Sequence, residues 1–258
     1  MNAPRTISSR DNPLLVRVRK LAQDGSAYRR AGQVWIEGEH LCTALHARGR
    51  PAALALVAES AWTGEPALRR LAAAAAETVV VADRVFAASS GLESPARIGF
   101  LVELPQAPAL RPDVATVVLD RLQDAGNVGS ILRSAAAFGV TQVLAIKGSA
   151  ALWSPKVLRA GMGAHFALAL AEGLDEAALA TLAVPLVATS SHGGVALRSA
   201  ALPRPCAWVF GHEGQGVSVT LQSRCALAVR IPQPGGEESL NVAAAAAVCL
   251  YESASRGQ

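Results

Sequence analysis

A stretch from Asp120 to Gly139 holds residues whose types and spacing suit a polar binding site. Gly126 and Gly129 let the backbone approach a ligand closely, and Asn127 is a residue type that favours a helix N-cap. Arg133 follows, and its spacing predicts a place about a turn and a half into a helix. A guanidinium stays protonated at neutral pH, so it can hold a phosphate but cannot accept a proton. The stretch therefore predicts a polar site with one fixed cation.

The elements on either side of this stretch favour a site between them. The apolar run Val114 to Leu119 predicts a buried strand, and apolar residues at helical spacing from Ile131 to Phe138 predict a helix. Open α/β sheets place their sites at the carboxyl ends of strands. A strand-to-helix turn can also contain glycine and asparagine for purely structural reasons, so this stretch alone does not define a function.

Two later stretches repeat the plan of hydrophobic strand, glycine-rich polar loop and helix start. They are Trp208-Val-Phe-Gly-His-Glu-Gly-Gln-Gly-Val-Ser218 and Ile231-Pro-Gln-Pro-Gly-Gly-Glu-Glu-Ser-Leu-Asn-Val242. With the three stretches in this order, the chain resembles the SpoU/TrmH-type RNA 2′-O-ribose methyltransferases of the SPOUT superfamily, from about Val114 to Glu252. Three ordered motifs are far more specific than one loop.

The resemblance implies methyl transfer from S-adenosylmethionine to a ribose 2′-hydroxyl in structured RNA, and it favours ribosomal over transfer RNA. A 2′-hydroxyl is a poor nucleophile, so the reaction needs alignment with the methyl carbon and removal of a proton near the transition state. It requires no metal. Main-chain groups of irregular loops suit the adenine and ribose of the cofactor.

The resemblance also assigns roles to individual residues. The residues expected to bind the cofactor are Thr189, Gly211, Gly216, Ile231, Pro232 and Leu240. Arg133 matches the family arginine that has been assigned to activating the hydroxyl, but its permanent charge favours clamping a phosphate and steering the hydroxyl. Asn127 and Glu213 are expected to order the loops. Ser239 and Asn241 either contact a ligand or cap the last helix.

Two residues depart from the family pattern. Ala125 stands where proline is usual and should only loosen the turn. His212 stands where asparagine is usual and brings a titratable ring beside the cofactor loop. We therefore expect His212 to affect the pH dependence of the reaction more than the activity itself.

Two other functions remain as alternatives. The first is a catalytically inactive RNA-binding protein on a SPOUT scaffold, although Arg133 and Asn127 are both retained. The second is a nucleotide-dependent enzyme that uses Gly211 to Gly216 as a phosphate loop, but this loop lacks the Gly-Lys-[Ser/Thr] ending.

Composition indicates a soluble cytoplasmic protein. The 258 residues are 51% hydrophobic, mostly through alanine, and no uncharged apolar run approaches the length of a membrane span. Basic residues interrupt the first apolar run, so we expect no secretion signal. Cys42, Cys206, Cys225 and Cys249 lack metal-ligand spacing, and we expect free thiols and no metal.

The net charge of +4 is concentrated at the start of the chain. Residues 1–30 hold seven basic side chains against two acidic ones. Asn12-Pro13 predicts a helix start, followed by one apolar and one basic helical face. Beside an RNA-modifying motif set, we expect phosphate contacts from Arg5, Arg10, Arg17, Arg19 and Lys20; a merely solvated face is the alternative.

The chain is predicted to form an α/β fold in two domains. Residues 1–105 should form the basic helix and a small α/β RNA substrate-binding domain, 106–113 a proline-rich linker, and 114–258 a SPOUT domain with a mainly parallel sheet. The resemblance implies that the C-terminal part forms a deep trefoil knot, and that the protein is a homodimer with the knots near its interface.

Overall fold

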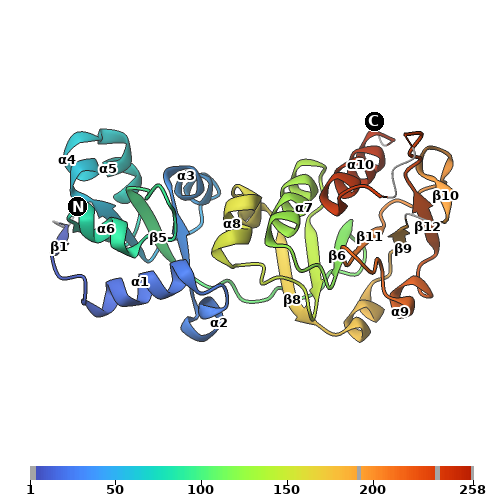
Figure 1. The fold of residues 1–258 in the computed structure, drawn as a ribbon, viewed down its shortest axis with the longest axis horizontal. Coiled ribbons are helices and arrows are strands. Elements are labelled where there is room, and N and C mark those ends of the chain that lie inside the picture. The colour runs from blue at the N-terminus through green and yellow to red at the C-terminus, as the bar shows by residue number, and fades with distance from the viewer. Residues whose placement is uncertain (1–3, 191–192, 236–238, 257–258) are drawn as a thin grey trace. The chain divides into compact units, whose positions relative to one another are not determined.

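The computed structural model describes residues 4–190, 193–235 and 239–256. It forms two compact units (Figure 1). The first comprises Met1–Gln106 with Trp153–Phe166, and the second comprises Ala107–Leu152 with Ala167–Gln258. The segment Trp153–Phe166 lies within the range expected for the second domain but belongs to the first unit.

The first unit is built on a five-stranded mixed sheet. In spatial order its strands are β1 (Arg5–Ile7), β4 (Glu77–Val81), β3 (Leu54–Ala58), β5 (Ile98–Glu103) and β2 (Gln33–Glu37). Strand β5 runs antiparallel to both neighbours, whereas β1, β4 and β3 are parallel. Its α-helices are α1 (Pro13–Gln23), α2 (Ala27–Ala31), α3 (Glu39–Ala47), α4 (Glu59–Gly64), α5 (Pro66–Ala72), α6 (Asp83–Ser89) and α8 (Pro155–Gly161).

The first helix forms as its sequence predicts. The Asn12 side chain accepts a hydrogen bond from the Leu14 backbone N–H at 3.0 Å, and Pro13 occupies the first turn. The buried side chains of α1 are Leu15, Val18, Leu21 and Ala22, which form its apolar face. Its basic residues lie outside this face and remain available to solvent.

The second unit is built on a seven-stranded parallel sheet, which confirms the predicted fold class. In spatial order its strands are β10 (Val195–Ala196), β12 (Leu227–Arg230), β9 (Leu186–Thr189), β11 (Ala207–Gly211), β6 (Thr116–Asp120), β7 (Gln142–Ile146) and β8 (Ala169–Leu174). Its helices are α7 (Ala125–Ala137), α9 (Val219–Gln222), α10 (Val242–Ser255) and the 3₁₀ helices η2 (Glu176–Thr181) and η3 (Leu197–Ser199).

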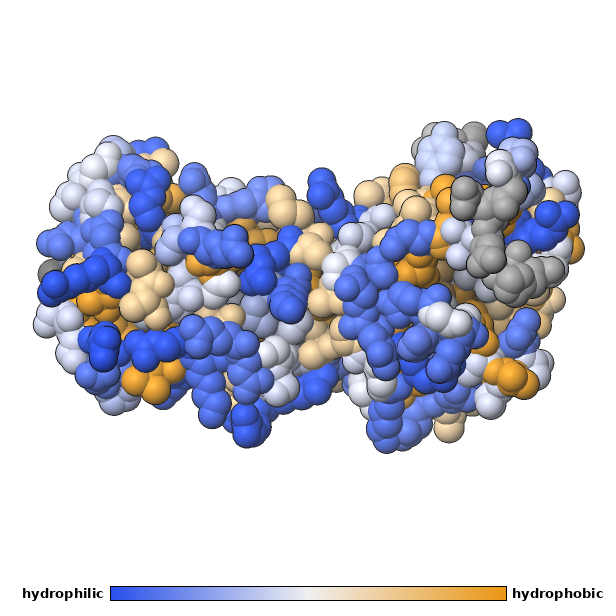
Figure 2. Space-filling model, viewed as in Figure 1, coloured by the Kyte–Doolittle hydropathy of each residue, from blue (hydrophilic) through white to orange (hydrophobic). Residues whose placement is uncertain are grey.

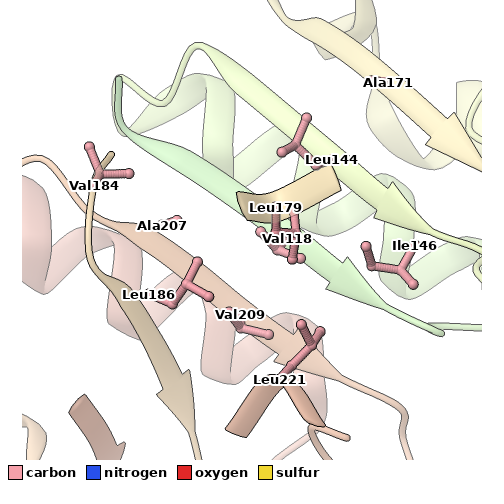
Figure 3. Close-up of a cluster of buried hydrophobic side chains, with 10 residues drawn as sticks. All are labelled: Val118, Leu144, Ile146, Ala171, Leu179, Val184, Leu186, Ala207, Val209 and Leu221. Atoms are coloured by element: carbon pink, nitrogen blue, oxygen red, sulfur yellow. The ribbon is translucent and has the colours of Figure 1, made fainter. Parts of the chain in front are cut away.

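Every residue of the interior strand β6 is buried, as expected for a parallel strand covered on both faces. On one face, η2 and α9 cover an apolar cluster (Figure 3). Its members are Val118, Leu144, Ile146, Ala171, Leu179, Val184, Leu186, Ala207, Val209 and Leu221. Helix α10 packs against α7 and β11. This packing holds the strand ends that carry the three motifs.

Several predicted elements differ from the observed ones. The residue pattern over 65–76 predicts one helix. The helix observed there is α5, which ends at Ala72 because the chain turns there to enter β4 beside β3, and the separate helix α4 precedes it. The sequence also predicts a strand over 166–170 and a helix over 175–182. The structure has the 3₁₀ helix η1 (Ala164–Ala167) followed by β8 at the first place, and the 3₁₀ helix η2 at the second. Short apolar runs do not distinguish these conformations by periodicity.

The four cysteines are free thiols. Burial raises the pKa of Cys206 to about 11 and that of Cys249 to about 12, so both stay protonated at neutral pH. Within the described residues, no group of three or more His, Cys, Asp or Glu side chains is placed to hold a metal ion. No helix of the described ranges is long and apolar enough to cross a membrane.

Candidate functional site

A cavity of about 700 Å³ opens at the carboxyl ends of β9, β11 and β12 in the second unit. It is lined by Thr189, Ser190, Gly211, His212, Glu213, Gly214, Gln215, Gly216, Val217, Gln222, Val229, Ile231, Gln233, Ser239, Leu240, Asn241, Val242 and Ala245. Five of the six residues expected to bind the cofactor are in this lining, and Pro232 is not. The second and third motifs therefore meet at one cavity.

The loop that follows β11 is folded back on itself. The Gly216 N–H donates to the His212 carbonyl at 2.8 Å, and the Gly214 N–H donates to His212 Nδ1 at 3.0 Å. Gly211 has no room for a side chain, because a Cβ there would overlap the backbone of Gly216 and Val217. Backbone therefore forms much of this wall, as suits a cofactor bound by main-chain groups.

Helix α7 is capped by Asp124, and the expectation that Asn127 is the N-cap is wrong. Asp124 Oδ1 accepts a hydrogen bond from the Asn127 N–H at 2.7 Å, and the helix begins at Ala125. The predicted place of Arg133 shifts accordingly to about two turns into the helix. Because it is not the cap, Asn127 has its side chain available for other contacts.

The Asn127 side chain joins the three motifs. Its Nδ2 donates to Glu213 Oε1 at 3.3 Å, and its Oδ1 accepts from Asn241 Nδ2 at 3.0 Å. These contacts connect residues 86 and 114 positions apart in the chain. The hydrogen bonds bring the three loops together at one edge of the cavity.

Glu213 orders the loop before α7. Its carboxylate accepts from the backbone N–H groups of Gln123 at 3.3 Å and Asp124 at 3.1 Å. Burial by itself raises the pKa of the Glu213 carboxyl, but the backbone N–H groups of Glu213, Asp124 and Gln123 and the Asn127 amide together outweigh it and lower the pKa. The ionised carboxylate is therefore the form that holds this loop.

We predict that the contribution of Glu213 is present at neutral pH and is lost in acid. Because its folded pKa is lowered, the stabilisation is complete above the ordinary glutamate value of 4.5 and falls as pH drops through the folded pKa. Glu213→Gln should weaken cofactor binding about three- to tenfold at pH 7, the range of one net hydrogen bond. Calorimetric titrations and melting curves at several pH values measure both effects. The exposed Glu93→Gln is the matched control, and equal acid sensitivity of Glu213→Gln and the unmodified protein would contradict this role.

Asn241 caps α10, with its Oδ1 accepting from the N–H groups of Ala243 at 2.9 Å and Ala244 at 3.3 Å. The sequence pattern predicts that the last helix begins at Leu240, whereas the observed helix begins at Val242. The capping alternative thus holds for Asn241, while its Nδ2 serves the network with Asn127. Ser239 lines the cavity, and its side chain makes no hydrogen bond with the described residues.

Arg133 is exposed on α7, and its side chain makes no hydrogen bond or ion pair with the described residues. An ion pair with Glu213, the structural alternative for this arginine, is absent from that part of the chain. Arg133 is not among the residues that line the cavity, although it lies on the helix whose first turn carries Asn127. Its guanidinium is therefore free to meet a ligand from solvent.

Asp120, for which the sequence suggested no role, anchors the loop that follows β11. Its carboxylate is fully buried and accepts from the Ser218 N–H at 2.6 Å. It also pairs with Arg121 Nε at 3.0 Å, and Arg121 in turn donates to Gln215 Oε1 at 3.2 Å. An acidic residue that ends an apolar strand was the signal available in the sequence.

The five residues expected to contact RNA lie in the first unit, and four of them have protein partners. Arg5 pairs with Glu77 at 3.2 Å and Arg10 with Asp11 at 3.8 Å. Arg17 donates to Gln33, and Arg19 donates to the carbonyls of Ala88 and Arg10. Lys20 is exposed, and its ammonium group makes no such contact with the described residues.

A parallel sheet with a glycine-lined cavity at the carboxyl ends of its strands defines an α/β protein that holds a nucleotide-like cofactor. Residues 115–251 match the SpoU rRNA Methylase family. The chain belongs to this family, and the resemblance drawn from the motifs is confirmed.

Relatives and solved structures agree over most of the chain. An uncharacterized tRNA/rRNA methyltransferase of Synechocystis sp. is 33% identical over 96% of this chain and 92% of its own length. The 23S rRNA (guanosine(2553)-2′-O)-methyltransferase RlmP of Bacillus subtilis is 29% identical over 84% of this chain and 86% of its own. The AdoMet-bound rRNA methyltransferase of Sinorhizobium meliloti has a TM-score of 0.85 at 25% identity, covering 98% of both chains.

Proposed function

We propose that this protein transfers a methyl group from S-adenosylmethionine to the 2′-hydroxyl of a ribose in ribosomal RNA. The observation that carries this proposal is the network of Asn127, Glu213 and Asn241, which joins the three family motifs beside a cavity with a main-chain wall. Family membership and the names of the relatives support the same reaction.

The test is transfer of labelled methyl from S-adenosylmethionine to ribosomal RNA by the purified protein, followed by digestion to nucleosides. A 2′-O-methylnucleoside is the expected product, and mapping ribose methylation in a strain lacking the protein identifies the position. Cofactor binding without transfer to ribosomal or transfer RNA would instead point to an RNA-binding protein on the same scaffold.

The residues of this chain act mainly by positioning. Bound S-adenosylmethionine supplies an electrophilic methyl on a cationic sulfur. The loops that contain Gly211 and Leu240 would hold the cofactor. Glu213 connects the first of these loops to the start of α7 through its hydrogen bonds to Asp124 and Asn127. Arg133 clamps a phosphate of the RNA and steers the 2′-hydroxyl toward the methyl carbon. With the cofactor bound, the hydroxyl oxygen would form the new C–O bond as the sulfur–methyl bond breaks and S-adenosylhomocysteine leaves. The hydroxyl proton would pass to a phosphate oxygen or to water.

We place the main RNA contacts on basic side chains of the first unit. The residues expected from the sequence there are largely engaged with protein groups. Several other basic side chains make no hydrogen bond or ion pair with the described residues, and four arginines among them lie close together in the fold. They are Arg48, Arg50, Arg69 and Arg70. All four are exposed and lie at or just beyond the last turns of α3 and α5, which pack against each other.

The four arginines share one edge of the sheet. The segments after α3 and α5 lead into the adjacent parallel strands β3 and β4, where Leu54 pairs with Glu77. The Ala76 N–H also donates to the Ala52 carbonyl at 3.0 Å. Guanidinium groups that hold no carboxylate are the least costly to turn toward RNA phosphates.

We predict that changing these four arginines together to glutamine weakens RNA binding more than the same change at Arg10, Arg17, Arg19 and Lys20. Every phosphate that the protein no longer neutralises should reduce the slope of log affinity against log salt by about 0.7–0.9. Filter-binding titrations over a salt series measure this slope, and cofactor affinity should stay unchanged in both variants. If the variant at Arg10, Arg17, Arg19 and Lys20 lost more RNA affinity, the main RNA contacts would instead lie on and next to α1.

We also propose a homodimer with a C-terminal knot, located in the cytoplasm. An apolar surface on α10 supports the dimer, because Val248 and Tyr251 are 42% and 59% exposed and lie on one face of the helix. Tyr251 meets Phe138 of α7 edge to face at 5.9 Å. Figure 2 shows apolar surface, in orange and tan, in this part of the second unit.

A further inference from the structure

The side chain of Gln233 has a buried acceptor without a donor. Its Oε1 is shielded from solvent and receives no hydrogen bond from the described residues. Gln233 lines the same cavity as Ile231 and Gly211. A buried amide oxygen left unpaired destabilises the folded protein, and a bound ligand that donates to it removes this cost.

The lining of the cavity favours one kind of donor. Aliphatic side chains share the cavity lining, namely Val217, Val229, Ile231 and Leu240. A flat heteroaromatic ring loses little by burial against such side chains, whereas an ammonium group needs several hydrogen bonds to offset its lost hydration. Within S-adenosylmethionine, the ring with N–H donors on its edge is adenine, through its 6-amino group.

We infer that Gln233 recognises the adenine of the cofactor by accepting a hydrogen bond from the 6-amino group at Oε1. This inference rests on the proposed cofactor. It adds a side-chain determinant of base specificity to a cavity that the backbone of the Gly211 loop and aliphatic side chains line. A ring with a 6-oxo group, as in hypoxanthine, would place one acceptor against another and bind more weakly.

The test compares S-adenosylhomocysteine with S-inosylhomocysteine, which differ at this position of the ring, by calorimetry on the full-length protein. The unmodified protein should prefer the adenine ligand by about tenfold to a hundredfold, as expected when a buried acceptor is left unpaired. Gln233→Met keeps the length of the side chain but removes the acceptor, and should lower the preference to about threefold or less. Gln233→Glu offers only acceptors, so the preference should persist.

Gln106→Met is the matched control, because this glutamine is exposed and does not line the cavity, and the preference should not change. If Gln233→Met weakens both ligands equally, the donor lies on the ribose or the amino acid and the assignment to adenine is wrong. If it weakens neither, Gln233 contacts no part of the ligand. A folded, unmodified protein that bound neither ligand would instead count against the cofactor itself. Melting curves of each variant establish that folding is intact.

Discussion

Arg133→Ala is expected to lower single-turnover methyl transfer about 10²- to 10⁴-fold, the range for loss of one positioning or proton-transfer group. Melting temperature and cofactor affinity should remain close to those of the unmodified protein. The reason is that the Arg133 side chain is exposed and makes no hydrogen bond or ion pair with the described residues. Its removal therefore leaves no partner unpaired in that part of the chain.

Arg133→Lys separates charge from geometry at this position. Lysine keeps the positive charge but not the planar fork that binds a phosphate through two parallel hydrogen bonds, so it should restore little of the rate. Substantial recovery would mean that charge alone is needed and that the clamp is wrong. A lowered melting temperature together with weaker cofactor binding would instead assign Arg133 a structural role. Rate, affinity and melting should be measured on the same preparations.

Asp120→Ala is expected to destabilise the second unit by about 3 kcal/mol, because it removes a buried charged acceptor and leaves the Ser218 N–H and the Arg121 Nε–H without their partner. The loop from Gly211 to Ser218 should then lose its anchor, and cofactor affinity should fall about tenfold or more. Urea titration measures the free energy of unfolding, and calorimetry measures the affinity.

Two further variants test this role of Asp120. Asp120→Asn retains one acceptor for Ser218 and should lie between the alanine variant and the unmodified protein. Asp175→Ala is the matched control, because Asp175 pairs with Lys147 at the surface, where such pairs contribute about 0–1 kcal/mol. Equal destabilisation by Asp120→Ala and Asp175→Ala would show that burial of the first carboxylate carries no particular weight.

The sequence by itself determined the family, the fold class and most residues of the cavity. The glycines of the three motifs predict local backbone conformation, since a glycine such as Gly211 is required where two backbone segments nearly touch. Short apolar runs such as that of Val117, Val118 and Leu119 identify buried parallel strands without knowledge of their neighbours. Thr189, Ile231 and Leu240, which the family resemblance assigned to the cofactor, all line the cavity.

Only the tertiary structure decided how the motifs act on one another. Asn127 is a good N-cap by residue type, but Asp124 caps the helix and leaves Asn127 to join Glu213 with Asn241. Periodicity and propensity report on neighbours within a few residues, whereas these bonds span 86 and 114 positions. The burial of Asp120 and the unpaired oxygen of Gln233 likewise depend on which strands lie side by side, and strand order is set by packing of the whole sheet.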